Sequence, residues 1–244
     1  MKRFIILLLN TAMAIATLSQ NIPEGYILQY QQDFSGENPI NDLRSDDFQF
    51  WTIGSSSGNK YLLFNHRMDV DSTKYSHGGD VDSPACSPLN ICLIKNYIFG
   101  DFIIEASLMQ SGVSADGGIW ILFGIKDSLK YYCVDVSSTD EGQNKGLFVV
   151  EDAQPVQIPC NQYRNIRWNP GKWHKVRIER NIVDTSVRVF FDDMKEPYLV
   201  TKDRTFIMGY IGFGSGAGEW RIDNIKIWSQ TSIPEPAKFL QELF

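Results

Sequence analysis

Two carboxylates and two aromatic side chains occupy matching positions in three short alternating stretches of the sequence. The stretches read DFIIEASLMQ, GIWILFGIK and KYYCVDVSS, at residues 101–110, 118–126 and 130–138. Apolar residues alternate with the others in each, which is the pattern of a strand with one buried face. The face opposite the apolar residues then carries Glu105, Trp120, Tyr131 and Asp135.

These four side chains together suit a sugar. An aromatic ring stacks on the apolar face of a pyranose, and carboxylates accept hydrogen bonds from its hydroxyls. Two carboxylates can also divide into an acid and a base or nucleophile, as in glycoside hydrolysis. We therefore take Glu105 and Asp135 as candidate catalytic residues, and Trp120 and Tyr131 as candidate substrate-binding residues. The alternative is a solvated sheet face with ordinary polar residues.

A second polar group lies in the stretch FNHRMDVDSTKYSHGGDVDSP, residues 64–84. His66, Arg67 and His77 are its candidate substrate-binding residues, because such a loop suits the mouth of a binding cleft. A hydrated surface loop is the alternative. The stretch resembles a calcium loop in part, but it lacks the bidentate Glu at the twelfth position, so an EF-hand is excluded.

The glycines of GYIGFGSGAGEWRIDNIKIW, residues 209–228, do not form a dinucleotide-binding loop. Counted from Gly212, the sixth position of G-x-G-x-x-G is Ala217. The motif must also open a helix, whereas another alternating stretch follows here. The glycines instead allow tight turning between two strands.

Short alternating runs separated by turn residues continue along the chain, and no helical periodicity is sustained between residues 26 and 230. The fold class is therefore all-β, with an antiparallel sandwich or barrel at residues 20–230. In the tail, residues 231–244, two prolines end the last strand. Residues 237–244 are expected to form a short amphipathic helix, which either packs on the body or docks on another surface.

Residues 1–19 have the pattern of a secretory signal peptide, with Lys2 and Arg3 before an apolar run. The run is too short and too interrupted for a transmembrane anchor, so we expect a secreted or periplasmic protein without a membrane span. Removal of this segment changes the net charge from −6 to −8. An acidic protein repels phosphate backbones and anionic lipids, which argues against nucleic acid and membranes as partners.

Four cysteines, all in the exported part, allow three pairings. We expect a Cys86–Cys92 disulfide, which closes a short loop, and consider Cys133–Cys160 as a second bridge. Four buried thiols are the alternative, although an oxidising compartment disfavours them.

The order FGDFIIEASL, GGIWILFGI, YYCVDVS, NPGKWHKVRIER, VRVFFDD, IGFGSGAGEWRIDNIKIW resembles secreted concanavalin A-like jelly rolls. Over residues 95–228 it is most similar to the 3-keto-disaccharide hydrolase family. The resemblance implies two curved antiparallel sheets with a glycan site on the concave face. The related family 16 glycoside hydrolases carry E-x-D-x-x-E on one strand. This chain has CVDVSSTDE instead, so that mechanism is not expected.

The resemblance to family 16-like jelly rolls also implies a structural calcium ion, held by an acidic residue of the final strand and by the N-terminal segment. The matching position on the final strand is Asp223 in RIDNIKIW, and the N-terminal segment QQDFSGENP offers Asp33 as a further carboxylate. Calcium prefers six to eight oxygen ligands. The alternative is that Asp223 caps a β-bulge through backbone amides.

The sequence thus predicts an exported protein whose partner is a carbohydrate, bound on one face of a jelly roll. Hydrolysis of a 3-keto-glycoside or a related sugar is one alternative, and it depends on the resemblance. A non-catalytic interaction scaffold that uses the C-terminal tail is another.

Overall fold

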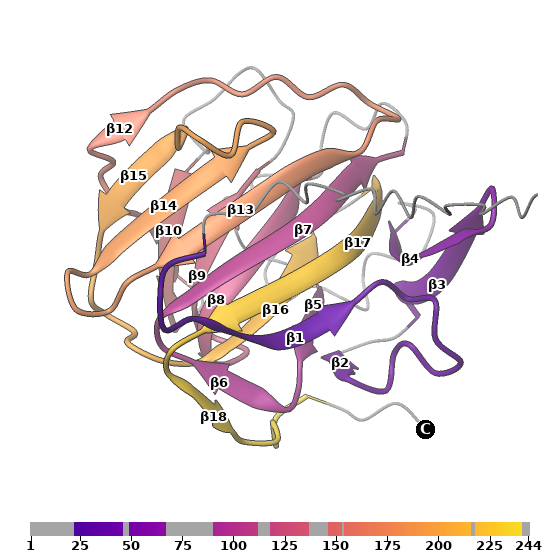
Figure 1. The fold of residues 1–244 in the computed structure, drawn as a ribbon, viewed down its shortest axis with the longest axis horizontal. Coiled ribbons are helices and arrows are strands. Elements are labelled where there is room, and N and C mark those ends of the chain that lie inside the picture. The colour runs from indigo at the N-terminus through magenta and orange to yellow at the C-terminus, as the bar shows by residue number, and fades with distance from the viewer. Residues whose placement is uncertain are drawn as a thin grey trace, which may run out of the picture.

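The computed structural model describes residues 22–45, 49–66, 90–111, 118–136, 146–152, 154–215 and 218–240. This part of the chain contains strands and turns but no helix. The strands form two stacked antiparallel sheets, one in front of the other in Figure 1. The predicted all-β sandwich is therefore confirmed. Within these residues there is also no helix long and apolar enough to cross a membrane.

The nine-stranded sheet, here called the large sheet, lies in front in Figure 1. Strand β1 pairs with β17 beside its main path. From one edge to the other the path is β12 (Gln162–Tyr163), β15 (Leu199–Lys202), β14 (Ser186–Phe191), β13 (His174–Arg180), β7 (Phe102–Gln110), β17 (Gly218–Ser229), β4 (Asn59–His66) and β3 (Trp51–Ser56), with β1 (Ile27–Gln32) at the side.

The seven-stranded sheet, here called the small sheet, lies behind the large one. Its order is β11 (Gln154–Gln157), β10 (Gly146–Glu151), β9 (Lys130–Asp135), β8 (Ile119–Asp127), β16 (Tyr210–Ser215), β5 (Asn90–Ile94) and β2 (Leu43–Ser45). A separate pair at one end joins β18 (Ser232–Pro234) to β6 (Tyr97–Phe99).

The main core fills the space between the two sheets with the apolar residues of the alternating stretches. From β7 it takes Ile104, Ala106 and Leu108, and from β9 it takes Tyr132 and Val134, as predicted. Burial of such side chains contributes about 25 cal/mol per Å² of apolar surface removed from water. The alternating residues of these strands therefore face away from the core, on the outer surface of each sheet.

The phase of β8 changes within the strand. Ile119, Ile121 and Phe123 face the main core, but Ile125 belongs to a second cluster on the outer face, so its predicted inward position is wrong. The cause is Gly124, whose φ of 62° is a left-handed conformation that shifts the register with both neighbouring strands. A Cβ on Gly209 would lie 2.2 Å from the Gly124 carbonyl carbon, so glycine is required at the close approach.

An apolar cluster covers the outer face of the small sheet, and the C-terminal tail packs on it. The Ala237 amide donates to the Lys95 carbonyl at 2.7 Å, and the Phe239 ring meets Tyr210 edge-on at 5.5 Å. We call this the outer cluster; its buried members are Ile91, Leu93, Trp120, Leu122, Ile125, Tyr131, Cys133, Phe148, Val150, Tyr210 and Ala237. Residues 235–240 are not helical, so the expected helix is wrong over residues 237–240. Residues 241–244 lie outside the described part.

The cysteines also differ from the prediction. Cys133 in β9 takes part in a disulfide, whereas Cys92 in β5 and Cys160 carry thiols. Both expected bridges, Cys86–Cys92 and Cys133–Cys160, are therefore wrong, and Cys86 lies outside the described residues. Half-burial raises the pKa of the Cys160 thiol, so it stays protonated near neutral pH.

Candidate functional site

Trp120 and Asp135 lie directly opposite each other on β8 and β9, on the outer face of the small sheet. Directly opposed residues of an antiparallel pair have Cβ atoms about 5 Å apart, so the two side chains start from adjacent positions on the sheet. Gly214 is the partner of Trp120 on one side, and Gly146 is the partner of Asp135 on the other. The pair is thus flanked across the sheet by two positions without side chains.

The indole of Trp120 keeps an unused hydrogen-bond donor. The residue is 8% exposed, and its Nε1 atom is buried without a partner. Leaving a buried donor unpaired costs about 1–3 kcal/mol of stability. Such a donor is therefore available to a water molecule or to a polar group of a ligand. Asp135 beside it is 7% exposed.

Burial and the negative charge of Asp135 raise the pKa of two tyrosines near β12 and β15, Tyr198 and Tyr163. Burial is the main cause of each raised pKa, and the charge of Asp135 is the next. The two rings meet edge-on with centroids 6.2 Å apart. The Tyr198 hydroxyl, like the Trp120 indole, is buried without a hydrogen-bond partner.

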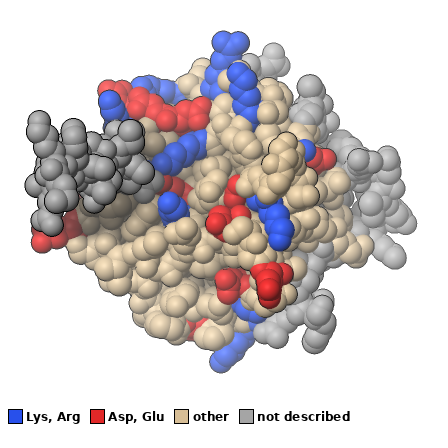
Figure 2. Space-filling view, turned by 45° about the vertical axis from the view of Figure 1, so that its right-hand side comes forward, with Lys and Arg blue, Asp and Glu red and all other residues tan. Residues whose placement is uncertain are grey.

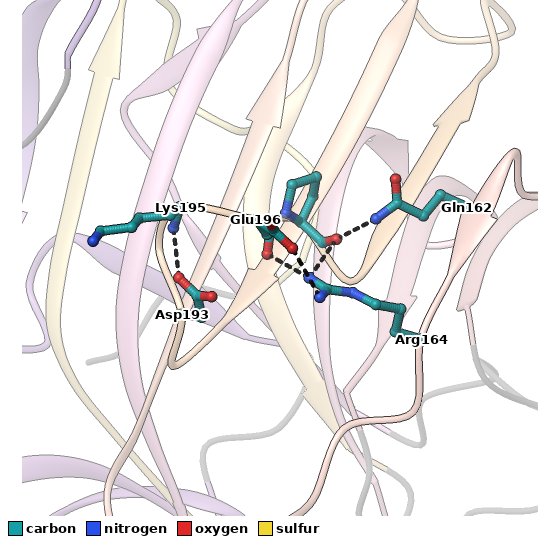
Figure 3. A network of polar contacts seen from close by, with 6 residues as sticks. Gln162, Arg164, Asp193, Lys195 and Glu196 are labelled. Atoms are coloured by element: carbon teal, nitrogen blue, oxygen red, sulfur yellow. Dashed lines mark hydrogen bonds and ion pairs between the residues drawn. The ribbon is translucent and has the colours of Figure 1, made fainter.

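A network of polar contacts holds Gln162 and Arg164, the two neighbours of Tyr163 in the chain (Figure 3). The Arg164 guanidinium donates to Glu196 Oε2 at 3.1 Å and to the Glu196 and Pro197 carbonyls at 3.0 and 3.1 Å. Gln162 Nε2 donates to the same Pro197 carbonyl at 2.8 Å. Tyr163 lies in the chain between these two anchored residues, and its ring meets the buried Tyr198 ring edge-on.

Tyr131 shares the outer face with Trp120, as predicted, because Tyr132 next to it faces the main core. Tyr131 is only 4% exposed and packs in the outer cluster. The prediction of two open stacking rings is therefore wrong. Trp120 presents an indole N–H rather than an open ring face, and Tyr131 is a buried member of the same outer cluster.

Glu105 does not join this site. It lies on β7 in the large sheet, so the prediction that it shares a face with Asp135 is wrong. Strands β7 and β8 follow each other in sequence but belong to different sheets. Glu105 is 2% exposed and is held by Lys175 Nζ at 2.7 Å and Arg177 Nη1 at 3.3 Å.

The ion pairs around Glu105 continue along the outer face of the large sheet. Arg177 contacts Glu179 at 2.7 Å, and Glu179 contacts Arg188 at 2.7 Å. We call Glu105, Lys175, Arg177, Glu179 and Arg188 the ion-pair row. Figure 2 shows side chains of both charges close together on one side of the molecule. Glu105 is thus a member of a structural ion-pair row, not a partner of Asp135.

The predicted cleft loop lies mostly outside the described residues. His66 is the last residue of β4, where its backbone pairs with Gly218. Arg67 and His77 lie outside the described part, so their role stays a prediction. His174 in β13 is 3% exposed, and its Nδ1 atom lies 2.8 Å from Asp192 Oδ2.

The residues of the expected calcium site form a capped β-bulge. Asp223 Oδ1 accepts from the Asn224 amide at 2.6 Å, and Oδ2 accepts from Asn59 Nδ2 at 2.9 Å. The register of β17 shifts there, with Asn224 at φ 52°. Burial, and to a smaller extent the negative charge of Asp33, raises the pKa of Asp223. Both carboxylate oxygens are thus occupied by donors, as the alternative expected.

Asp33 does not complete a metal-binding group with Asp223. Its carboxylate accepts from the Ser35 amide and hydroxyl at 3.0 and 2.7 Å. Within the described ranges, no three His, Cys, Asp or Glu side chains come together as metal ligands. The described residues show the bulge cap, and the calcium ion stays a prediction for Asp33 and Asp223.

Gly212 and Gly214 lie inside strand β16, so their predicted place in a tight turn is wrong, and the sequence interpretation did not relate Gly146 or Gly214 to the candidate site. Gly146 and Gly214 each stand within or at the start of an alternating stretch, where a glycine indicates a bulge or a close approach of another group. That signal was present in the sequence, but it could not be connected to Trp120 and Asp135 before the strand order was known.

No protein-family model matches the chain, and a search of curated proteins found no match to its sequence. Several solved structures share the fold. Carbohydrate binding module CBM66 from Bacillus subtilis aligns with a TM-score of 0.54 at 16% identity, covering 78% of this chain and 96% of the module. A Bacillus subtilis protein of unknown function with a galectin-like fold also gives 0.54, at 10% identity and 86% and 100% coverage.

A third structure, the cellulose induced protein Cip1, aligns with a TM-score of 0.50 at 12% identity, covering 83% of this chain and 98% of its own. At these identities the likeness establishes the fold alone, a jelly roll of two antiparallel sheets. The predicted concanavalin A-like architecture is thereby confirmed. Membership of the 3-keto-disaccharide hydrolase family is not.

Proposed function

We propose that the protein binds a glycan on the outer face of the small sheet, with Trp120 and Asp135 as the contacting residues. The observation that carries the proposal is the directly opposed Trp120–Asp135 pair with an unpartnered indole N–H. The shared fold with a carbohydrate-binding module supports the ligand class. A fold alone does not grant a function, so the site carries the argument.

A sugar hydroxyl suits this pair because it both donates and accepts hydrogen bonds. The Trp120 Nε1–H donates to a hydroxyl oxygen, and the Asp135 carboxylate accepts from the same or the adjacent hydroxyl. Hydrogen bonds to a charged group contribute about 1.5–3 kcal/mol, and neutral ones about 1 kcal/mol. Because the Trp120 Nε1 atom and most of Asp135 are buried, the proposed contact requires neighbouring side chains to move aside when the sugar binds.

The test compares two conservative variants on a panel of soluble neutral oligosaccharides built from glucose, galactose, xylose, arabinose and fructose. Trp120→Phe removes the indole N–H and keeps a ring, and Asp135→Asn removes the charge and keeps the shape. Each should weaken binding of the recognised sugar about tenfold. Trp228→Phe, on the large sheet, is the matched control. Binding of wild-type strength by both variants would contradict the proposal.

Hydrolysis of a 3-keto-glycoside is the second function, supported by the sequence resemblance. Since Glu105 lies in the ion-pair row of the other sheet, it does not act with Asp135. Asp135 alone would then serve as the acid or base. Incubation with a 3-keto-glycoside, followed by measurement of the released sugar in wild type and Asp135→Asn, distinguishes hydrolysis from binding without turnover.

We further propose that the protein is exported, to the periplasm or the medium. The disulfide of Cys133 supports this, because disulfides persist in oxidising compartments. Ala237 and Phe239 of the C-terminal tail pack on the protein's own outer cluster. This packing argues against the alternative in which the tail binds another protein as part of an interaction scaffold. Cell fractionation of the producing cells, with and without residues 1–19, tests the location.

The structural calcium ion stays a prediction for Asp33 and Asp223. Calorimetric melting with and without a chelator tests it. Bound calcium would make the chelator lower the melting temperature, whereas the capped bulge alone predicts the same temperature in both samples.

A further inference from the structure

Trp173 exposes an aromatic ring beside the outer face of the large sheet, just before β13. The residue is 39% exposed, whereas most aromatic residues of the described part are buried or half-buried. Its indole meets the Tyr61 ring of β4 edge-on, with centroids 6.0 Å apart. The Arg221 guanidinium of β17 lies 4.9 Å from the centroid of the same Tyr61 ring. Three elements that are distant in sequence thus meet at one place.

The Tyr61 ring is fixed by the strand beside it. Gly54 of β3 is its direct cross-strand partner, and a Cβ on Gly54 would lie 2.4 Å from Tyr61 Cε2. The ring therefore lies flat across the glycine, and it is only 5% exposed. Its position under Arg221 adds a cation–π contact.

The loop that carries Trp173 is also anchored. The Gly171 amide donates to the Gln110 carbonyl at 2.9 Å, with Gly171 in a left-handed conformation at φ 76°. His174, the next residue after Trp173, accepts from the Asn169 amide through Nε2 at 3.1 Å. Nδ1 of His174 contacts Asp192 at 2.8 Å. The exposed indole is therefore held in place by its own loop before any ligand arrives.

Polar groups remain accessible beside this indole. Glu219 and Arg221 form an ion pair at 3.3 Å, with side chains 29% and 24% exposed. Nε of Arg221 is buried and has no hydrogen-bond partner. Half-buried Asn65 lies opposite Glu219 on β4. The exposed indole is thus connected through the Tyr61 ring to Arg221, and through Arg221 to the carboxylate of Glu219.

We infer that Tyr61, Trp173, Glu219 and Arg221, here called the Trp173 cluster, form a second glycan-binding site. A sugar ring stacks on the exposed indole, and its hydroxyls bond to Glu219 and Arg221. The ligand is neutral, because the adjacent carboxylate compensates the Arg221 charge. The inference shares only the ligand class with the proposed function, since none of its residues belongs to the small-sheet site.

A protein partner is the competing occupant of an exposed tryptophan. The polar pair favours a sugar, because an apolar protein contact would desolvate Glu219 and Arg221 without replacing their bonds to water. The two sites lie on opposite outer faces of the sandwich. One molecule can therefore hold two glycan segments at once, which raises avidity for a polysaccharide over a short oligosaccharide.

Isothermal titration with the same neutral oligosaccharides tests the inference through two variants of the full chain. Trp173→Ala removes the stacking surface, and Glu219→Gln removes the charged acceptor; each should weaken one of two binding events roughly tenfold. Val183→Ala, 87% exposed, is the matched surface control. The isotherm of Trp173→Ala should keep one binding event at wild-type affinity and show the other about tenfold weaker.

The result separates this site from the small-sheet site. In a Trp120→Phe background, Trp173→Ala should still weaken sugar binding about tenfold. That result would support the second site even if Trp120 and Asp135 bind no sugar. Binding of every oligosaccharide unchanged by Trp173→Ala, or no binding by any of them, overturns the inference. A change in sedimentation alone, with self-association lost in Trp173→Ala, overturns it in favour of a protein contact.

Discussion

The two outer faces of the sandwich bury their side chains by different means. On the large sheet, charged residues of neighbouring strands pair with one another, as in the contact of Glu105 with Lys175 and Arg177. On the small sheet, apolar residues form a second cluster on which the chain's own tail packs through Ala237 and Phe239. Strands with the same alternation thus produce an ion-pair row on one face and a covered apolar face on the other.

The difference matters for function because each face leaves a different kind of group available to a ligand. The small sheet leaves the Trp120 N–H beside Asp135 in buried surroundings, where hydrogen bonds are stronger. The large sheet leaves the Trp173 indole exposed beside the Glu219–Arg221 pair. The first face suits recognition of individual hydroxyls, and the second suits stacking of a sugar ring.

The largest expected effect is on the ion-pair row. Glu105→Ala removes one of the carboxylates that contact the 4% exposed Arg177 and also removes a partner of Lys175. The free energy of unfolding should therefore fall by about 2–3 kcal/mol, although Glu179 still contacts Arg177. Arg188→Ala, at the exposed end of the same row, should change it by less than about 1 kcal/mol. Urea unfolding measures both. Equal effects would mean that burial does not distinguish the two ends of the row.

A smaller effect is expected at Tyr132, which faces the main core between the two outer faces. Its hydroxyl donates to Asp203 Oδ1 and accepts from the Phe206 amide at 3.0 Å. Burial, with the Asp203 contact next, raises the pKa of Tyr132 to about 12. Tyr132→Phe leaves the Phe206 amide unpaired and should lower the free energy of unfolding by about 1–2 kcal/mol.

The same variant has a pH signature. Burial opposes ionisation of Asp203, but hydrogen bonds from Tyr132 and Thr205 outweigh it and lower the pKa of this carboxyl. A lowered folded pKa gives stability that is complete above the ordinary value of about 4 and is lost as pH falls through the folded pKa. Tyr132→Phe should reduce this loss in acid. An identical pH dependence in both proteins would contradict the assignment.

The smallest effect on stability is expected where the tail meets the outer cluster. Phe239→Ala removes the edge-on contact with Tyr210 and should lower the free energy of unfolding by about 1 kcal/mol. Lys238→Ala, exposed beside it, is the control. Chemical unfolding with both variants measures the difference. A larger loss in Lys238→Ala than in Phe239→Ala would mean that the tail is not held by this ring.

The alternation in the sequence predicted the all-β sandwich and the side of each strand that faces the core. Trp120, Tyr131 and Asp135 do face outward together, and Glu105 also faces outward. Alternation does not indicate to which of the two sheets a strand belongs. Because β7 and β8 follow each other in sequence, alternation suggests that they are neighbours in one sheet. They lie in different sheets, so Glu105 faces outward on the large sheet and not beside Asp135.

Other features depended on contacts between distant residues. The bulge at Gly124 reverses the phase for Ile125, and a single glycine in the sequence does not say whether such a bulge forms. Trp173 stands before a strand in NPGKWHKVRIER, and nothing in that stretch indicates that Tyr61 and Arg221 will meet it. Burial of Trp120 also depends on what covers it, so its expected openness was wrong.

The central claim is that the Trp120 indole and Asp135 contact a glycan. Nuclear magnetic resonance of the 15N-labelled protein follows each tryptophan indole N–H directly, and the missing signal of Trp120→Phe identifies that of Trp120. Addition of the recognised oligosaccharide should shift the Trp120 signal in a saturable manner, and Asp135→Asn should need about tenfold more sugar for the same shift. A Trp120 signal that stays unmoved at saturating sugar, while other signals shift, would contradict the claim.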